Sequence, residues 1–436
     1  MYKVAVIGLG YFSQFHLKSW GTMPGAHLVA ATDLDPARRA WAQAEMNAPI
    51  VADLQEALAQ DPDIVDIVAP PVAHAELVQA ALAKGRTIIC QKPFCTSLDE
   101  ARAVTDTAEK AGARLLIHEN FRFQPWYRTM KNVLDSGTLG QVFSARFALR
   151  PGDGRGPDAY LSRQPSFQTM KRLLIHETGV HFIDLFRWLL GDVRAVYADL
   201  RQLNPVLQGE DAGLMILHHD SGATSTFDGN RLSDHRTDAP RRTMGEMEIE
   251  GEGGTLCLDG MGRVTLRAFG TQNVQHLEPA YPPDETFGGG CVNALNMHVV
   301  AALDGRQVFE NEAKDYLPVI ALSELAYTSD ARGQKMKVEK NKMFAVCVEL
   351  TIRPGQMDKF LPLMRANAST SLREEPDCHR FDVVQVDDAP DLITLYEVYT
   401  NAAAFQTHLG TTHFQQFDAA VTDLVAQKSV RTGTVL

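Results

Sequence analysis

Val4-Ala5-Val6-Ile7-Gly8-Leu9-Gly10-Tyr11-Phe12-Ser13 decides how the N-terminal part of this 436-residue chain folds. The apolar run predicts a buried strand, and the glycines after it open a helix. Gly8 permits the tight turn, Gly10 lets the backbone approach a pyrophosphate, and the small Ser13 allows the helix to pack closely on the strand. Because the N–H groups at the start of a helix favour an anion, the stretch predicts a dinucleotide site.

Asp33 favours NAD as the dinucleotide. It ends the next apolar run, twenty residues beyond Ser13. An acidic side chain at this place accepts hydrogen bonds from ribose hydroxyls and repels a 2′-phosphate. Leu34 follows it, and not an arginine that would attract the phosphate of NADP. The alternative is a glycine turn without a ligand, which leaves the acidic residue at this spacing unexplained.

The composition is that of an acidic globular protein. A net charge of −12 and a pI near 5.6 argue against nucleic acid and anionic membranes as partners. No apolar run approaches the roughly 20 residues that span a bilayer, and the first strand starts too close to Met1 for a signal peptide. The six cysteines form no C-x-x-C pair, which predicts reduced thiols. We therefore expect a cytoplasmic protein.

The order of the patterns predicts an α/β fold class with two domains before residue 338. Residues 1–121 alternate apolar runs with helical patterns, as in an N-terminal Rossmann domain with a parallel sheet. Residues 122–338 carry helical patterns at 176–190 and 313–331 and several β-like runs between turns. These features predict an α+β substrate domain with a mainly antiparallel sheet.

A third domain is expected at residues 343–436, after the polar boundary Lys335–Lys342. Its order of elements, βαββαβ, is ferredoxin-like. The strands are expected at 344–352, 381–386, 393–399 and 429–434, and the helical segments at 356–372, 402–409 and 414–427.

Several motifs in sequence order resemble the Gfo/Idh/MocA oxidoreductase family over about residues 1–338. They are Gly8-x-Gly10 with His16, Ala69-Pro70-Pro71 with His74, Gln91-Lys92-Pro93, Asn120-x-Arg122, Glu177-x-Gly179-x-His181-x-x-Asp184, and Tyr327-x-Ser329. The resemblance implies an NAD-dependent enzyme that oxidises a hydroxyl group of a sugar or polyol.

The resemblance also implies the catalytic residues. Lys92 would lie beside the nicotinamide, where its ammonium stabilises the reacting oxygen. His181 would be the general base that takes the alcohol proton, and Glu177 would bind a substrate hydroxyl or orient the lysine. Two positions depart from the family, because Gln91 replaces a glutamate and Glu177 replaces a frequent aspartate. The first departure puts the orientation or charge of Lys92 in question.

Other site residues follow from the same motifs. Helical spacing places Glu177, His181 and Asp184 on one face of the expected helix. The residues expected to bind the cofactor are Gly8, Gly10, Tyr11, Phe12, Asp33, Pro70, His74, Gln91, Lys92 and Asn120. The residues expected to bind substrate are Arg122, His176, Glu177 and His181, and no metal is expected.

Three stretches look most like the D-apiose dehydrogenase branch of the family: Phe12-Ser13 with His16-Leu17, residues 176–182, and Gly209-Glu210-Asp211-Ala212-Gly213. That branch implies oxidation of an aldose such as D-apiose to its lactone. Three alternatives stay open for the chain: a redox-neutral NAD-cycling epimerase or dehydratase, a non-enzymatic NAD-binding sensor, and a monooxygenase. We expect a homodimer or homotetramer.

The C-terminal residues 343–436 resemble the antibiotic-biosynthesis-monooxygenase-like (ABM) domains, which pair into a dimeric α/β barrel. The markers include Pro354-Gly355, Tyr396-Glu397-Val398-Tyr399 and the run from Ala404 to Phe414. Glu397, His408 and His413 are candidates for an acid–base cluster. The domain is expected to serve dimerisation, a follow-on isomerisation or lactone-processing step, or cofactor-free monooxygenation.

Overall fold

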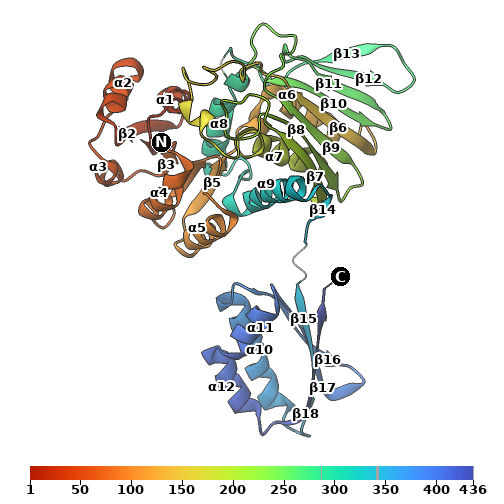
Figure 1. The fold of residues 1–436 in the computed structure, drawn as a ribbon. Helices are drawn as coiled ribbons and strands as arrows, with labels where there is room; N and C mark the ends of the chain where they lie inside the picture. The colour runs from red at the N-terminus through yellow and green to blue at the C-terminus, as the bar shows by residue number, and fades with distance from the viewer. Residues whose placement is uncertain (286, 340–342, 436) are drawn as a thin grey trace. The chain divides into compact units, whose positions relative to one another are not determined.

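The computed structural model describes residues 1–285, 287–339 and 343–435. The chain divides into two compact units, Met1–Val338 and Glu339–Leu436 (Figure 1). The expected boundary Lys335–Lys342 includes residues 340–342, which lie outside the described residues. Of the described helices, none is long and apolar enough to cross a membrane.

The first unit begins with a parallel sheet, as the sequence predicts. The strand order is β2-β1-β3-β4-β5, and every pair is parallel. The strands are β1 (Tyr2–Ile7), β2 (Ala26–Thr32), β3 (Ile64–Ile67), β4 (Thr87–Gln91) and β5 (Arg114–His118). The helices are α1 (Ser13–Thr22), α2 (Pro36–Met46), α3 (Leu54–Ala59), α4 (His74–Ala81) and α5 (Leu98–Lys110).

The glycine turn between β1 and α1 lies where strand β3 leaves no room for a side chain. Gly8 has a φ of +99°, and a Cβ placed on it would lie 2.6 Å from the carbonyl oxygen of Val68. A Cβ on Gly10 would meet no atom closer than 3.8 Å. The structure thus requires glycine at the first position for its own packing, whereas a Cβ at the second position would make only an ordinary contact with the Arg38 side chain.

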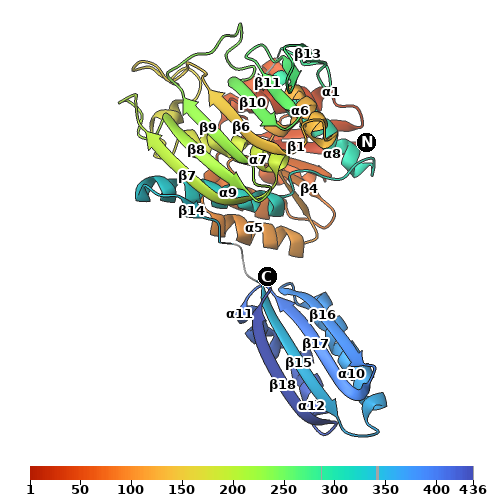
Figure 2. The same ribbon diagram turned by 90° about the vertical axis from the view of Figure 1, so that its right-hand side faces the viewer.

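The second part of the first unit is a nine-stranded sheet in the described residues (Figure 2). Its order is β13-β12-β11-β10-β6-β9-β8-β7-β14, and among the described pairs of this sheet only β6 and β9 are parallel. The mainly antiparallel sheet is therefore confirmed. The strands are β6 (Val142–Leu149), β7 (Val193–Arg201), β8 (Ala212–His219), β9 (Thr224–Asn230), β10 (Gly245–Gly251), β11 (Gly254–Leu258), β12 (Val264–Ala268), β13 (Val274–Leu277) and β14 (Met336–Lys337).

Helices α7 and α9 join the two sheets of this unit (Figures 1 and 2). Helix α9 (Ala313–Arg332) packs on β7 of the large sheet and on α5 and β5 of the parallel sheet. The other helices here are α6 (Pro125–Asp135), α7 (Val180–Leu190) and α8 (Cys291–Leu303).

The expected helix at 176–190 is wrong in its first turn. Leu174–Gly179 forms a π-helical turn, and α7 starts only at Val180. Gly179 allows this wide turn to close, because a Cβ there would press on the Ile175 side chain at 3.1 Å. The turn changes the phase of the helix between Glu177 and the residues that follow, and such turns are frequent at functional sites.

The second unit has the expected ferredoxin-like order. Its antiparallel sheet runs β16-β17-β15-β18. The expected helix at 414–427 is wrong at its end, because β18 already pairs with β15 from Val425 onward and tertiary pairing overrides local preference. The elements are β15 (Phe344–Ile352), α10 (Met357–Glu374), β16 (Cys378–Val386), β17 (Ala389–Tyr399), α11 (Ala402–Leu409), α12 (Thr412–Val421) and β18 (Val425–Thr434).

Two glycine substitutions separate packing from ligand binding. Gly8→Ala should lower the thermal midpoint, since the strained φ alone costs about 1–3 kcal/mol and the Cβ collides with Val68. Gly10→Ala should fold normally and bind NAD more weakly. Calorimetry and NAD titration measure both effects, and a Gly8→Ala protein as stable as the wild type would contradict the turn geometry.

Candidate active site

Lys92 directly follows β4 and binds Glu177, which lies in the π-helical turn before α7. Its Nζ donates to the Glu177 carboxylate at 2.8 Å and to the Glu177 backbone carbonyl at 2.7 Å. Both side chains are more than four-fifths buried. Against the opposing effect of burial, Lys92 and Arg231 hold the pKa of Glu177 well below its usual range. Glu177 is thus an anion that fixes the position of the ammonium.

His181 lies on the first turn of α7 and is held by Glu119. Its Nδ1 lies 2.5 Å from a carboxylate oxygen of Glu119, and its ring stacks on Phe121 with centroids 3.8 Å apart. Burial lowers the pKa of His181, and the positive charge of Lys92 lowers it further. The hydrogen bond to Glu119 places the ring proton on Nδ1, so Nε2 is a free base.

Glu119 itself is fully buried. Although burial opposes ionisation, the His181 imidazole and the Lys92 ammonium hold the pKa of Glu119 below its ordinary value. Tyr316 donates a second hydrogen bond to its other oxygen at 3.2 Å. Sequence reasoning missed Glu119, whose signal was a charged residue directly after the apolar strand β5.

Arg231 is a second residue that sequence reasoning missed. Its side chain is 1% exposed, and it donates to Glu177 at 3.0 Å and to both oxygens of Asp153 at 3.1 Å. Thr178 adds a hydroxyl that donates to Glu177 at 2.5 Å. Because Arg231 follows β9, far from Glu177 in sequence, no local pattern could pair them.

Gln91 lies in a buried polar network below Lys92. Its side-chain oxygen accepts the Lys92 backbone N–H at 2.9 Å, and its nitrogen lies 3.0 Å from Nε2 of His16. His16 in turn contacts the buried Asp66 at 2.7 Å. The replacement of the usual glutamate by Gln91 therefore leaves the Lys92 ammonium anchored, because Glu177 holds it from the other side.

The residues expected to hold NAD fit a dinucleotide. One oxygen of Asp33 accepts the Leu9 backbone N–H at 2.7 Å, which ties the carboxylate to the glycine turn. Tyr11 is exposed beside this turn, and Arg241 donates to its hydroxyl at 2.6 Å. Asn120 is 2% exposed at the end of β5, and its amide oxygen lacks a hydrogen-bond partner in the described chain. An orphaned acceptor of this kind suits a ligand amide.

The other expected site residues are placed less directly. His74 is buried and its Nε2 contacts the carbonyl of Ala69, so it braces the turn at Pro70. The guanidinium of Arg122 donates two hydrogen bonds to the carboxylate oxygens of Asp184, at 2.5 and 2.9 Å. The His176 ring is half-buried, and burial, Lys92 and Arg172 lower its pKa. Phe12 packs against Phe15 and Phe287.

Two of the candidates in the second unit share a partner that was not expected. His408 and His413 both lie 2.8 Å from the same carboxylate oxygen of Glu375, a residue that sequence reasoning missed. Glu397 instead accepts a hydrogen bond from Tyr399 at 2.9 Å. One side-chain nitrogen or oxygen atom from each of Glu375, His408 and His413 lies within 4.8 Å of the other two.

Comparison with known proteins identifies the family of the chain. Residues 2–119 match the oxidoreductase family with an NAD-binding Rossmann fold, and residues 127–257 match the Gfo/Idh/MocA C-terminal domain. The D-apiose dehydrogenase of Paraburkholderia graminis is 32% identical over 357 residues, which cover 80% of this chain and 93% of that protein. The chain belongs to the Gfo/Idh/MocA family of oxidoreductases. Residues 343–420 match the antibiotic biosynthesis monooxygenase family.

Further relatives of this Gfo/Idh/MocA protein include solved structures. The D-apiose dehydrogenase of Rhizobium rhizogenes is also 32% identical, over 77% of this chain and 97% of that protein. A crystal structure of an Agrobacterium radiobacter oxidoreductase with NAD⁺, L-tartaric acid and magnesium has a TM-score of 0.70 and 30% identity, and covers 77% of this chain and 98% of its own. The chain is an NAD-dependent oxidoreductase.

Replacing one atom of Glu119 tests its role. Glu119→Gln removes the negative charge that raises the pKa of His181. The pKa of His181 should therefore fall further, and the acidic limb of the kcat/KM profile should move to lower pH. The plateau should also drop, by roughly ten- to a hundredfold, because the imidazolium loses its counter-charge. Rates measured between pH 5 and 9 decide this; an unmoved limb would show that His181 is not the titrating base.

Proposed function

We propose that the chain oxidises a hydroxyl group of a sugar or polyol, with an aldose such as D-apiose, taken to its lactone, as the candidate substrate. The observation that carries the proposal is the paired arrangement of an anchored ammonium and a neutral imidazole. Lys92 and His181 come from the two halves of the first unit, and both adjoin the carboxyl edge of the parallel sheet. In open α/β sheets, ligands bind at that edge.

The residues divide the chemistry between them. His181 takes the hydroxyl proton at Nε2, while Glu119 balances the charge that the ring gains. Lys92 donates a hydrogen bond to the same oxygen and stabilises its developing negative charge. Glu177 and Arg231 keep the ammonium pointing into the site. NAD, when bound, would supply the hydride acceptor for the carbinol carbon.

The relatives support the choice of substrate class. Both D-apiose dehydrogenases align over nearly their full length with this chain. We assign residues 1–121 to NAD binding and 122–338 to substrate binding, with Pro70, His74, Gln91 and Asn120 on the cofactor side. His176 is the candidate for a direct substrate contact, whereas Arg122 supports the site through Asp184.

Assembly and location follow as separate proposals. We infer that residues 343–436 pair copies of the chain into a homodimer or homotetramer, because strand β18 lies at a sheet edge and is exposed along most of its length. The six free cysteines support a reducing compartment such as the cytoplasm.

Substitution of the two central residues tests the function. Lys92→Ala and His181→Ala should each lower the rate of NADH formation by roughly a hundredfold or more and still bind NADH. The measurement is NADH absorbance with a panel of aldoses and polyols, followed by NMR of the product. Arg102→Ala, at an exposed ion pair, serves as the matched control.

The same assay separates the alternatives. NADH released in proportion to product supports a dehydrogenase. Product that accumulates without NADH would instead point to an enzyme that cycles its NAD. Near-normal turnover in the double variant would refute the assignment of Lys92 and His181.

A further inference from the structure

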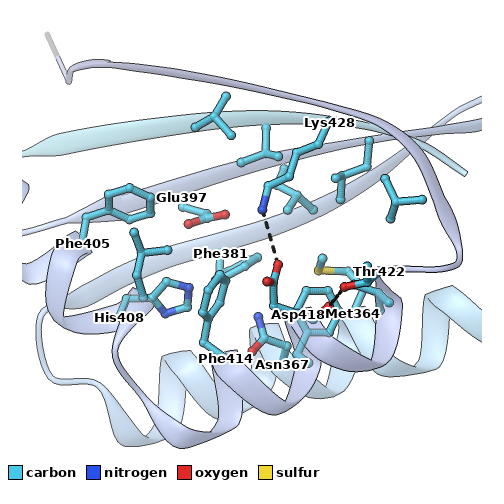
Figure 3. A pocket seen from close by; sticks show the side chains of 18 of the residues that line it. Met364, Asn367, Phe381, Glu397, Phe405, His408, Phe414, Asp418, Thr422 and Lys428 are labelled. Atoms are coloured by element: carbon cyan, nitrogen blue, oxygen red, sulfur yellow. Dashed lines mark hydrogen bonds and ion pairs between the residues drawn. The ribbon is translucent and has the colours of Figure 1, made fainter.

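The second unit contains a cavity of about 500 Å³ between its helices and its sheet (Figure 3). This volume is within the range of small-molecule sites. Aromatic rings form much of its wall, among them Phe381, Phe405 and Phe414. Polar and charged side chains interrupt that wall, among them Glu397, His408 and Asn367; the others are Asp418, Thr422, Gln427 and Lys428. None of them belongs to the dehydrogenase site, which lies in the other unit.

Glu397 is a buried carboxyl group in the cavity wall. It is 4% exposed and accepts the Tyr399 hydroxyl at 2.9 Å. Burial raises the pKa of Glu397 to about 7; the Tyr399 hydrogen bond and Lys428 oppose the shift, and Glu375 adds to it. Lys428 also forms an ion pair with Asp418 at 3.6 Å, so its positive charge is partly balanced by that residue. At neutral pH a large share of Glu397 is therefore a proton donor.

His408 is a base whose orientation is fixed. Its Nδ1 lies 2.8 Å from Glu375, which places the ring proton on Nδ1 and leaves Nε2 free. The ring packs on Phe414 with centroids 4.6 Å apart. Burial lowers the pKa of His408 although Glu375 opposes this effect. A neutral imidazole thus borders the cavity, and Glu375 acts as its positioning residue.

Asn367 supplies the observation that points to a ligand. It is 4% exposed on α10, and neither atom of its amide has a hydrogen-bond partner in the described chain. Figure 3 shows its side chain among the residues that line the cavity. Because an unpaired buried amide is destabilising, a polar ligand group is its natural partner.

We propose that this cavity is a second catalytic site, which hydrolyses the lactone of a small aldonic acid. A base, a proton donor and an amide donor around one cavity are the groups that ester hydrolysis needs. The choice of lactone rests on the proposed function of the first unit, whose oxidation of an aldose at its anomeric carbon yields this class of compound. The site would consume what the dehydrogenase produces.

The step balances without any oxidant or cofactor. His408 takes a proton from water at Nε2 as the water oxygen bonds to the lactone carbonyl carbon. The amide of Asn367 donates to the carbonyl oxygen, which carries the negative charge. When the bond from the carbonyl carbon to the ring oxygen breaks, Glu397 gives its proton to that oxygen. The product is the open hydroxy acid. The proton on His408 then returns to the Glu397 carboxylate, which restores both groups to their starting states.

The full-length chain without NAD tests the proposal directly, so that the dehydrogenase stays idle. The probe is the γ-lactone of D-ribonic acid, and acid release is followed with a pH indicator against the spontaneous rate. Glu397→Gln and His408→Gln should each lower the catalysed rate by roughly a hundredfold, and Asn367→Ala by at least tenfold. The wild-type rate should fall as pH rises through about 7, because Glu397 loses its proton there, and Glu397→Gln should lack that limb.

Controls keep loss of function apart from loss of fold. His379→Gln changes an exposed histidine of the same unit and should leave the rate unchanged, as should Lys92→Ala in the other unit. Circular dichroism and the thermal midpoint confirm that each variant is folded. Lactone hydrolysis that survives in Lys92→Ala while NADH formation is lost separates this proposal from the proposed dehydrogenase.

Several outcomes would overturn the proposal. They are a wild-type rate equal to the spontaneous one, a rate insensitive to both Glu397→Gln and His408→Gln, or intact lactone that has exchanged its α-hydrogen in heavy water, as an isomerase would produce. Oxygen uptake with the probe would point to a monooxygenase. Loss of the rate on treatment with EDTA would show that Glu375, His408 and His413 hold a metal ion and would refute the hydrogen-bonded role of Glu375.

Discussion

The carboxylate of Glu177 is the contact on which the dehydrogenase site depends. It receives Lys92 from the parallel-sheet domain and Arg231 from the large sheet, so one buried anion connects two separately built parts. Removal of one partner from a buried ion pair costs about 3–5 kcal/mol. Glu177 thereby holds the Lys92 ammonium where it can stabilise an alkoxide as it develops.

Burial is the main reason why the base beside Lys92 is neutral. The ammonium that stabilises the reacting oxygen lowers the pKa of His181 as well. Glu119 opposes both effects and fixes the ring by its hydrogen bond to Nδ1. The imidazole is consequently ready to accept a proton and has a counter-charge waiting when it does so.

The sequence predicted what is local and missed what is distant. Gly8 and the apolar run before it specify a turn that the packing against Val68 makes obligatory, so the parallel sheet could be foreseen. Lys92 and His181 were reached through motifs of a few residues. Arg231 and Glu375 were not, because their partners lie far away in sequence and no spacing rule connects them.

Helix phase is a second source of error. The spacing rule treats 176–190 as one α-helix, whereas the π-helical turn gives Glu177 a different partner set from His181 and Asp184. Nothing in the side-chain pattern marks such a turn. The structure shows why Gly179 suits it, because a Cβ at this position would press on the Ile175 side chain.

Both units orient a buried histidine with a carboxylate, but they differ in whether a nearby carboxyl group keeps its proton. In each, a carboxylate binds Nδ1 of a buried histidine and leaves Nε2 free, through Glu119 in the first unit and Glu375 in the second. Against the effect of burial, His181 and the Lys92 ammonium together keep the Glu119 carboxyl ionised. The Lys428 ammonium, which lowers the pKa of Glu397, is itself paired with Asp418, so burial prevails and raises that pKa. Hydride transfer to NAD needs no protein acid, whereas ring opening of a lactone does, and Glu397 is placed to serve as one.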